Sequence, residues 1–130
     1  MSAILPPVEK AIAELRACFC ESGVDAEADG SGGAYVTVGG VQLGPPYAQP
    51  ESWIGFQITF QYPYADVYPH FARPDLTRAD GRPLGDGLGM ARFRNQPALQ
   101  ISRRSNKLNP AIDTATLKLL KVLKWLRTHT

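Results

Sequence analysis

A chain of 130 residues with 44% hydrophobic and 20% charged residues has the size and composition of a single soluble globular domain. No apolar run is long enough to cross a bilayer, and residues 1–7 are too short and uncharged for a signal peptide, so we expect a cytoplasmic protein. The net charge of +2 is unevenly distributed: residues 1–80 carry ten acidic and four basic side chains, whereas residues 81–130 carry two acidic and ten basic side chains. Such a basic C-terminal part can steer an acidic partner to one face.

The first predicted element is an amphipathic helix that begins at Pro6 and Pro7. Proline suits this position because the first amides of a helix have no hydrogen-bond partner within it, so the missing N–H group costs nothing. Gly23 is the expected terminator. The apolar stripe has helical spacing and consists of Val8, Ile12, Leu15 and Phe19.

Both cysteines of the sequence, Cys18 and Cys20, fall in this predicted helix and project about 200° apart. They therefore do not bridge each other easily, and no histidine lies near them to complete a metal site. We expect reduced, partly buried thiols, and neither a metal nor a cofactor.

The next part of the chain predicts strands. Residues 21–33 are small, acidic and glycine-rich, which indicates a loop. Residues 34–43 are typical of a β-strand, and Gly39-Gly40 within them is either a hairpin turn or a bulge. Residues 44–51 contain three prolines and form a connection, and residues 53–60 alternate apolar and polar side chains as the strongest strand.

Shorter extended pieces follow. We expect a strand over residues 68–73 and a short extended segment over residues 97–102. Residues 76–95 hold several glycines and prolines and therefore predict a long loop, a kind of segment that is usually functional or mobile.

The last element is a helix that either Asp113 or Thr114 caps. Its apolar face consists of Ile112, Ala115, Leu119, Leu120, Val122, Leu123 and Leu126. A basic strip recurs at every third residue, at Lys118, Lys121, Lys124 and Arg127. Because the helix dipole favours positive charge near a C-terminus, we interpret this strip as structural rather than as a binding surface.

The most distinctive feature lies between the strands, in residues 60–71, where Tyr62-Pro63 and Tyr68-Pro69 are set among apolar residues. Each proline fixes its own φ, removes an amide donor and disfavours helix in the residue before it. We expect a stiff, non-helical platform. The whole chain then predicts one α+β domain over residues 1–130, with an N-terminal helix, an antiparallel meander of about four strands, a long loop and a C-terminal helix.

This order and these motifs resemble the ubiquitin-conjugating (UBC) fold, in particular the small bacterial UBC-like proteins encoded beside ubiquitin-like modifiers. The residues that match the family's proline-rich segment after its third strand are Phe60, Tyr62-Pro63, Tyr68-Pro69 and Phe71. A second block is similar to the tail of the bacterial proteins and consists of residues 97–106, Asn109-Pro110, Asp113-Thr114 and residues 121–126. The resemblance covers most of the chain and implies a part in ubiquitin-like conjugation and in antiphage defence.

The chain departs from that family at the catalytic centre. A conjugating enzyme needs a thiolate in the loop after the Tyr-Pro segment, but residues 76–106 contain no cysteine, and the family's His-Pro-Asn stretch is missing. The resemblance therefore implies no catalytic residue and a non-catalytic adaptor that binds the modifier, its activating enzyme or another partner. The alternative is an active conjugating enzyme whose cysteine has been replaced, with Ala91 and Ser102 as the positions to suspect.

The residues expected to bind partners come from the Tyr-Pro platform and from the loop before the last helix. They are Tyr62, Pro63, Tyr68, Pro69, His70, Arg103, Arg104 and Asn106. For His70 we favour a partly buried, hydrogen-bonded histidine over a general base, since no nucleophile is paired with it.

Two adjacent guanidinium groups, those of Arg103 and Arg104, could clamp a carboxylate such as the modifier's C-terminus or an acidic face of a partner. The alternative is that one arginine pairs with an acid inside the fold, the candidates being Asp66, Asp75 and Asp113.

Nucleic-acid binding is the competing function. It needs basic residues interleaved with exposed aromatic residues, whereas the basic part of the chain offers only Phe93 and Trp125. Residues 85–89 are glycine-rich but lack the Lys-Ser/Thr of a phosphate loop. We therefore consider nucleic acid an unlikely partner.

Overall fold

The computed structural model describes residues 4–85, 87–105 and 108–128. Within them the chain forms an α+β fold in which one helix precedes and one follows a six-stranded antiparallel sheet. No described helix is long and apolar enough to span a membrane. The elements are α1 (Pro6–Cys18), β1 (Val24–Ala28), β2 (Ala34–Gln42), β3 (Glu51–Ile58), β4 (His70–Ala72), β5 (Leu88–Phe93), β6 (Gln96–Ile101) and α2 (Ala115–Thr128).

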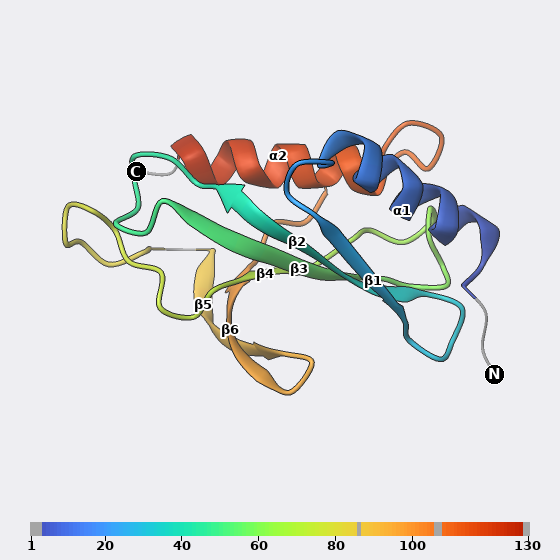
Figure 1. The fold of residues 1–130 in the computed structure, drawn as a ribbon, viewed down its shortest axis with the longest axis horizontal. Coiled ribbons are helices and arrows are strands. Elements are labelled where there is room, and N and C mark those ends of the chain that lie inside the picture. The colour runs from blue at the N-terminus through green and yellow to red at the C-terminus, as the bar shows by residue number, and fades with distance from the viewer. Residues whose placement is uncertain (1–3, 86, 106–107, 129–130) are drawn as a thin grey trace.

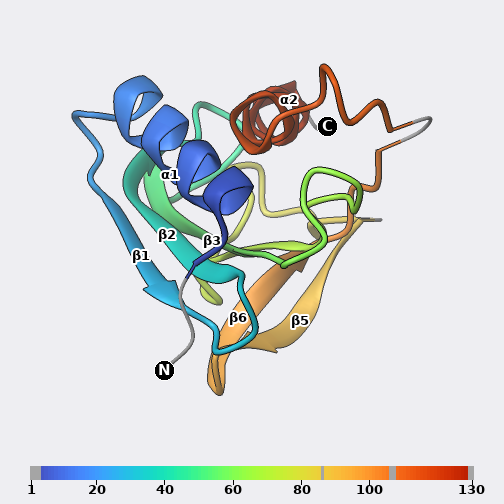
Figure 2. The ribbon, with the colours of Figure 1, turned by 90° about the vertical axis from the view of Figure 1, so that its right-hand side faces the viewer.

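The sheet has the strand order β1-β2-β3-β4-β6-β5. Strands β1 to β4 form a meander, and the β5–β6 hairpin joins it through antiparallel pairing of β6 with β4. Both helices cover the same face of the sheet, as Figures 1 and 2 show. The expected α+β order is confirmed, with two more strands than predicted.

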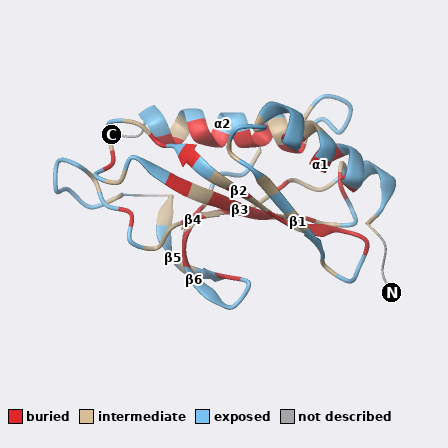
Figure 3. Cartoon of the chain, viewed as in Figure 1, coloured by how far each residue is buried: buried red, intermediate tan, exposed pale blue. Residues whose placement is uncertain are grey.

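The core lies between this face and the two helices (Figure 3). One row of inward side chains crosses four neighbouring strands, because the register pairs Val36 with Phe56, Phe56 with His70, and His70 with Ile101. The helices close this row with buried side chains at helical spacing, which are Val8, Ile12 and Leu15 of α1 and Leu119, Leu123 and Leu126 of α2.

Several predicted boundaries are wrong. Helix α1 ends at Cys18, so Cys20 lies beyond it, and Phe19 is the C-cap residue rather than part of the helical stripe. Residues 21–33, expected to be a loop, contain the edge strand β1, in which acids alternate with small apolar residues. Of the residues expected on the apolar face of the last helix, Ile112 lies before α2, and both Ile112 and Leu120 are exposed.

The Gly39-Gly40 pair forms a bulge and not a hairpin turn. Strand β2 continues through both glycines, and its pairing with β3 shifts register between Val38 and Val41. Of the two alternatives that the sequence leaves open, the bulge is therefore the one found.

The second missed strand, β5, lies in the predicted loop of residues 76–95. The two residues between β5 and β6, Arg94 and Asn95, have positive φ values of 52° and 66°. A two-residue hairpin needs such values, but the usual Asn-Gly or Asp-Gly signal is absent here. This hairpin could therefore not be predicted from its turn residues.

The hairpin bends back over the sheet face that the helices leave uncovered. The Phe93 ring stacks on Phe71 and Trp53 and meets Tyr35 edge to face, at centroid distances of 5.0, 6.2 and 6.2 Å. Arg94 lies over the Tyr35 ring and pairs with Glu27 of β1. A small aromatic cluster thus holds the hairpin in place.

This cluster requires a glycine beneath the Phe93 ring. A Cβ atom on Gly55 would lie 2.5 Å from that ring, whereas one on Gly89 would have nothing within 4 Å. We expect Gly55→Ala to lower the free energy of unfolding by about 1–3 kcal/mol and Gly89→Ala to change it by less than about 0.5 kcal/mol, both measured by urea denaturation. Equal effects of the two substitutions would contradict this packing.

Candidate functional site

The Tyr-Pro segment is fixed to α2 by a cluster of three side chains, Asp66, Ser105 and Lys118, which we call the Asp66 cluster. The Asp66 carboxylate accepts hydrogen bonds from Lys118 Nζ (3.0 Å), from the Ser105 amide (2.7 Å) and from Ser105 Oγ (2.8 Å). Lys118 Nζ also donates to Ser105 Oγ at 2.9 Å and is only 7% exposed. Burial raises the pKa of Asp66, but the hydrogen bonds from Ser105 and Lys118 outweigh it and hold that pKa below its usual value.

A second contact joins the same two elements. The Ala115 amide, in the first turn of α2, donates to the Tyr62 hydroxyl at 3.0 Å. Thr114 Oγ1 accepts from the Leu117 amide at 3.1 Å, so Thr114 is the side-chain cap, while Asp113 accepts from the Asn109 amide. The start of α2 is therefore held by the Tyr-Pro segment as well as by its own cap.

The segment itself is non-helical, as expected. Turns and bends cover residues 60–65, and the chain then runs through residues 66–69 into β4. Both the Tyr62-Pro63 and the Tyr68-Pro69 peptide bonds are cis.

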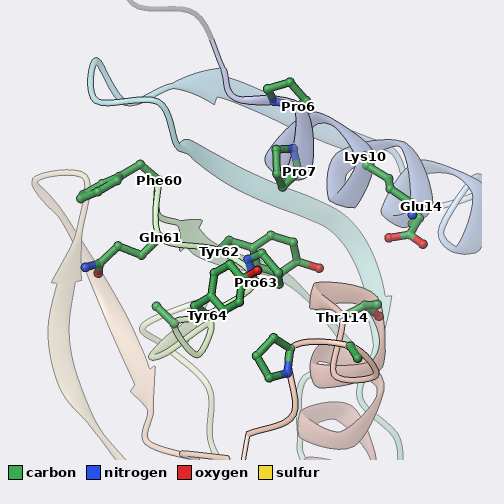
Figure 4. A pocket seen from close by; sticks show the side chains of 13 residues that line it. Pro6, Pro7, Lys10, Glu14, Phe60, Gln61, Tyr62, Pro63, Tyr64 and Thr114 are labelled. Atoms are coloured by element: carbon green, nitrogen blue, oxygen red, sulfur yellow. The ribbon is translucent and has the colours of Figure 1, made fainter.

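Between this segment and the helices lies a groove of about 970 Å³, the Tyr-Pro groove. Figure 4 shows Tyr62, Pro63 and Tyr64 between the start of α1, with Pro6 and Pro7, and the start of α2. Two aromatic side chains that line it face solvent: Phe60 is 54% and Tyr64 79% exposed. Ile112, which follows the lining residue Ala111 in the chain, is 61% exposed. Tyr62, in contrast, is 8% exposed, so most of its surface packs inside the fold.

Arg103 and Arg104 directly precede Ser105 of the Asp66 cluster, in the loop between β6 and α2. The Arg103 guanidinium lies 4.8 Å from the Trp125 ring centroid, and that of Arg104 lies 4.4 Å from the Tyr68 ring. Hydrogen bonds with Ser102 and Arg104 hold the pKa of Tyr68 below its usual value. Neither arginine pairs with a carboxylate among the described residues.

The three acids considered as internal partners of these arginines pair with other cations. Asp66 pairs with Lys118, Asp75 with Arg73 and Asp113 with Lys121. Of the two alternatives that the sequence leaves open, an internal ion pair of Arg103 or Arg104 with one of these acids is therefore not found among the described residues. Asn106, the remaining expected partner-binding residue of this stretch, lies outside the described residues.

The basic strip of α2 is not one continuous surface. Lys118 is buried in the Asp66 cluster, and Arg127 donates to the Gln42 carbonyl at 2.8 Å. Lys121 and Lys124 are the exposed members that remain at the middle of the helix. Three of the four residues thus make specific contacts within the fold: Lys118 with Asp66, Lys121 with Asp113 and Arg127 with the Gln42 carbonyl.

His70 differs from the expected partly buried, hydrogen-bonded histidine. It is fully buried at the centre of the sheet, its ring lies 5.0 Å from that of Phe56, and neither ring nitrogen has a hydrogen-bond partner among the described residues. Burial and, to a smaller extent, the charge of Lys118 lower the pKa of His70 to about 3, while the charge of Asp66 acts in the opposite direction. No surface of His70 is open to a partner in this structure.

This burial makes stability depend on pH. Below the ordinary His pKa of 6.5, the unfolded chain binds a proton that folded His70 does not bind until about pH 3. Between pH 7 and 4.5, we expect the free energy of unfolding of the wild type to fall by about 2–3 kcal/mol more than that of His70→Phe, because each pKa unit is worth about 1.4 kcal/mol. Urea denaturation across this range measures the difference, and parallel pH profiles for the two proteins would refute it.

The thiols lie away from these contacts. Cys18 and Cys20 are free and exposed, so the expectation of partly buried thiols is wrong. Ala91 lies in β5, and Ser102 follows β6 directly and accepts a hydrogen bond from Gln100 at 3.0 Å. The described residues contain no group of three or more potential metal ligands.

Sequence reasoning missed the Asp66 cluster and the exposure of Tyr64. In the sequence, Lys118 has the same spacing as the other members of the basic strip, including Lys121, which is exposed. The one available signal was position: Lys118 lies one residue before Leu119 and four before Val122, on the border of the apolar face.

Comparison with known proteins gave no match: no family model fits the chain, and no curated protein or solved structure resembles it significantly.

Proposed function

We propose that this chain is a non-catalytic, UBC-like adaptor of a bacterial ubiquitin-like conjugation system, in the setting of antiphage defence. It docks the ubiquitin-like protein, its activating enzyme or another protein of that system. The order of helix, meander, Tyr-Pro segment and final helix supports this proposal, since it is the order that the resemblance to UBC proteins implies.

The observation that carries the proposal is the apolar surface at the Tyr-Pro groove. Phe60 and Tyr64 line this groove and each expose more than half of their surface. An exposed apolar patch with aromatic residues is typical of protein–protein contact sites. The Asp66 cluster and the Tyr62 hydroxyl fix the segment beneath this patch, so a partner would meet a surface that is already ordered.

The distribution of thiols supports a binding role rather than catalysis. A conjugating enzyme holds its modifier on a thiolate, but no cysteine follows Cys20 in the sequence. Cys18 is the last residue of α1 and Cys20 lies beyond it, whereas the α1 residues that line the groove are Pro6, Pro7, Lys10 and Glu14.

The sharpest test replaces an exposed groove residue and leaves the fold intact. Tyr64→Ala removes a side chain that is 79% exposed, so we expect less than about 0.5 kcal/mol change in stability. Its affinity for a purified ubiquitin-like protein or activating enzyme encoded beside the gene should fall at least tenfold, as measured by calorimetry.

Met90→Ala is the matched control, because Met90 is 68% exposed on β5 and does not line the groove. It should bind like the wild type. Equal affinities of Tyr64→Ala and wild type would refute docking at the groove. Binding to random DNA with a steep salt dependence would favour the nucleic-acid alternative.

A further inference from the structure

A second, chemically different surface lies between the loop after β6 and α2. It is a hollow of about 200 Å³ whose wall includes Arg103, Arg104, Ser105, Lys121 and Trp125, and we call it the basic hollow. Arg103, Arg104 and Lys121 are exposed, and exposed Lys124 follows one helical turn after Lys121.

The two arginines are positioned before any ligand binds. The guanidinium of Arg103 lies over Trp125 and that of Arg104 over Tyr68, at 4.8 and 4.4 Å from the ring centroids. Stacking on a ring uses the face of a guanidinium and leaves N–H groups at its edge able to donate to an oxyanion. Such charge-assisted hydrogen bonds to carboxylates are among the strongest available.

The charges at this hollow do not cancel. Lys118 is neutralised by Asp66 at 3.0 Å, and Lys121 lies 3.6 Å from Asp113. Arg103 and Arg104 have no carboxylate partner among the described residues, and the hollow offers no other acid for them. The hollow therefore has two arginines without a carboxylate partner, next to two exposed lysines. A single carboxylate cannot pair with all of these cations, so the surface favours a ligand with several carboxylates in a row.

A nucleic acid fits this surface less well. Single strands bind by stacking bases on open aromatic faces, but the Trp125 and Tyr68 rings each already carry a guanidinium.

We propose that the basic hollow binds an acidic segment of a partner protein. One carboxylate lies between the guanidinium edges of Arg103 and Arg104, and the following acids lie along Lys121 and Lys124. The basic hollow would give the proposed adaptor a second contact surface, for an acidic segment. None of the residues that line the Tyr-Pro groove takes part in it.

A synthetic peptide tests this surface without the groove. The probe is a fluorescein-labelled, C-terminally amidated Ala-Asp-Glu-Glu-Asp-Ala, titrated with the full chain in 50 mM salt and followed by anisotropy. We expect saturable binding that weakens at least tenfold in Arg103→Gln/Arg104→Gln and severalfold in Lys121→Gln/Lys124→Gln. Thermal unfolding of each variant shows that it remains folded.

The matched control is Arg82→Gln/Arg92→Gln, which removes the same charge from exposed arginines outside the hollow and should bind within twofold of wild type. The probe with Asn and Gln in place of its acids should not bind. Equal weakening in the control, or tighter binding of oligo-dT than of the acidic probe, would overturn the proposal. Loss of groove docking in Tyr64→Ala with intact probe binding would separate the two surfaces.

Discussion

The ion pair between Asp66 and Lys118 determines where the Tyr-Pro segment lies. Asp66 comes from that segment, Ser105 from the loop after β6 and Lys118 from α2, so one carboxylate joins three parts of the chain that are distant in sequence. Because Lys118 is buried and Asp66 is 21% exposed, loss of either charge would leave the other poorly compensated, at less than the cost of about 3–5 kcal/mol that applies to a fully buried pair. Both proposed binding surfaces flank this cluster.

The same constraint explains why some side chains of the Tyr-Pro segment face inward and others face solvent. Tyr62 and Asp66 face inward and attach the segment to α2, while Phe60 and Tyr64 face solvent. A surface residue held by such anchors loses little conformational freedom when a partner binds. The inward residues therefore position the docking surface, and the outward residues are available for contact.

Local patterns in the sequence were sufficient to predict the two helices, strands β2 and β3 and the non-helical Tyr-Pro segment. They failed where tertiary contacts decide the outcome. Strand β5 exists because Phe93 packs on Gly55 and Phe71, contacts that no periodicity in residues 76–95 reveals. Lys118 is buried because Asp66, 52 residues earlier, lies opposite. Of the expected site residues, Arg103 and Arg104 are exposed together, whereas His70 belongs to the core.

Hydrogen exchange in Asp66→Asn tests the central claim, that the Asp66 cluster holds the docking segment in place. The account predicts that the amides of Ser105 and of the first turn of α2 lose at least tenfold protection, about 1.4 kcal/mol of local opening energy, while the β2 amides change less. Asp25→Asn, an exposed acid of β1, should leave all of these amides unchanged. Unchanged protection in Asp66→Asn, or an equal loss throughout the chain, would contradict it.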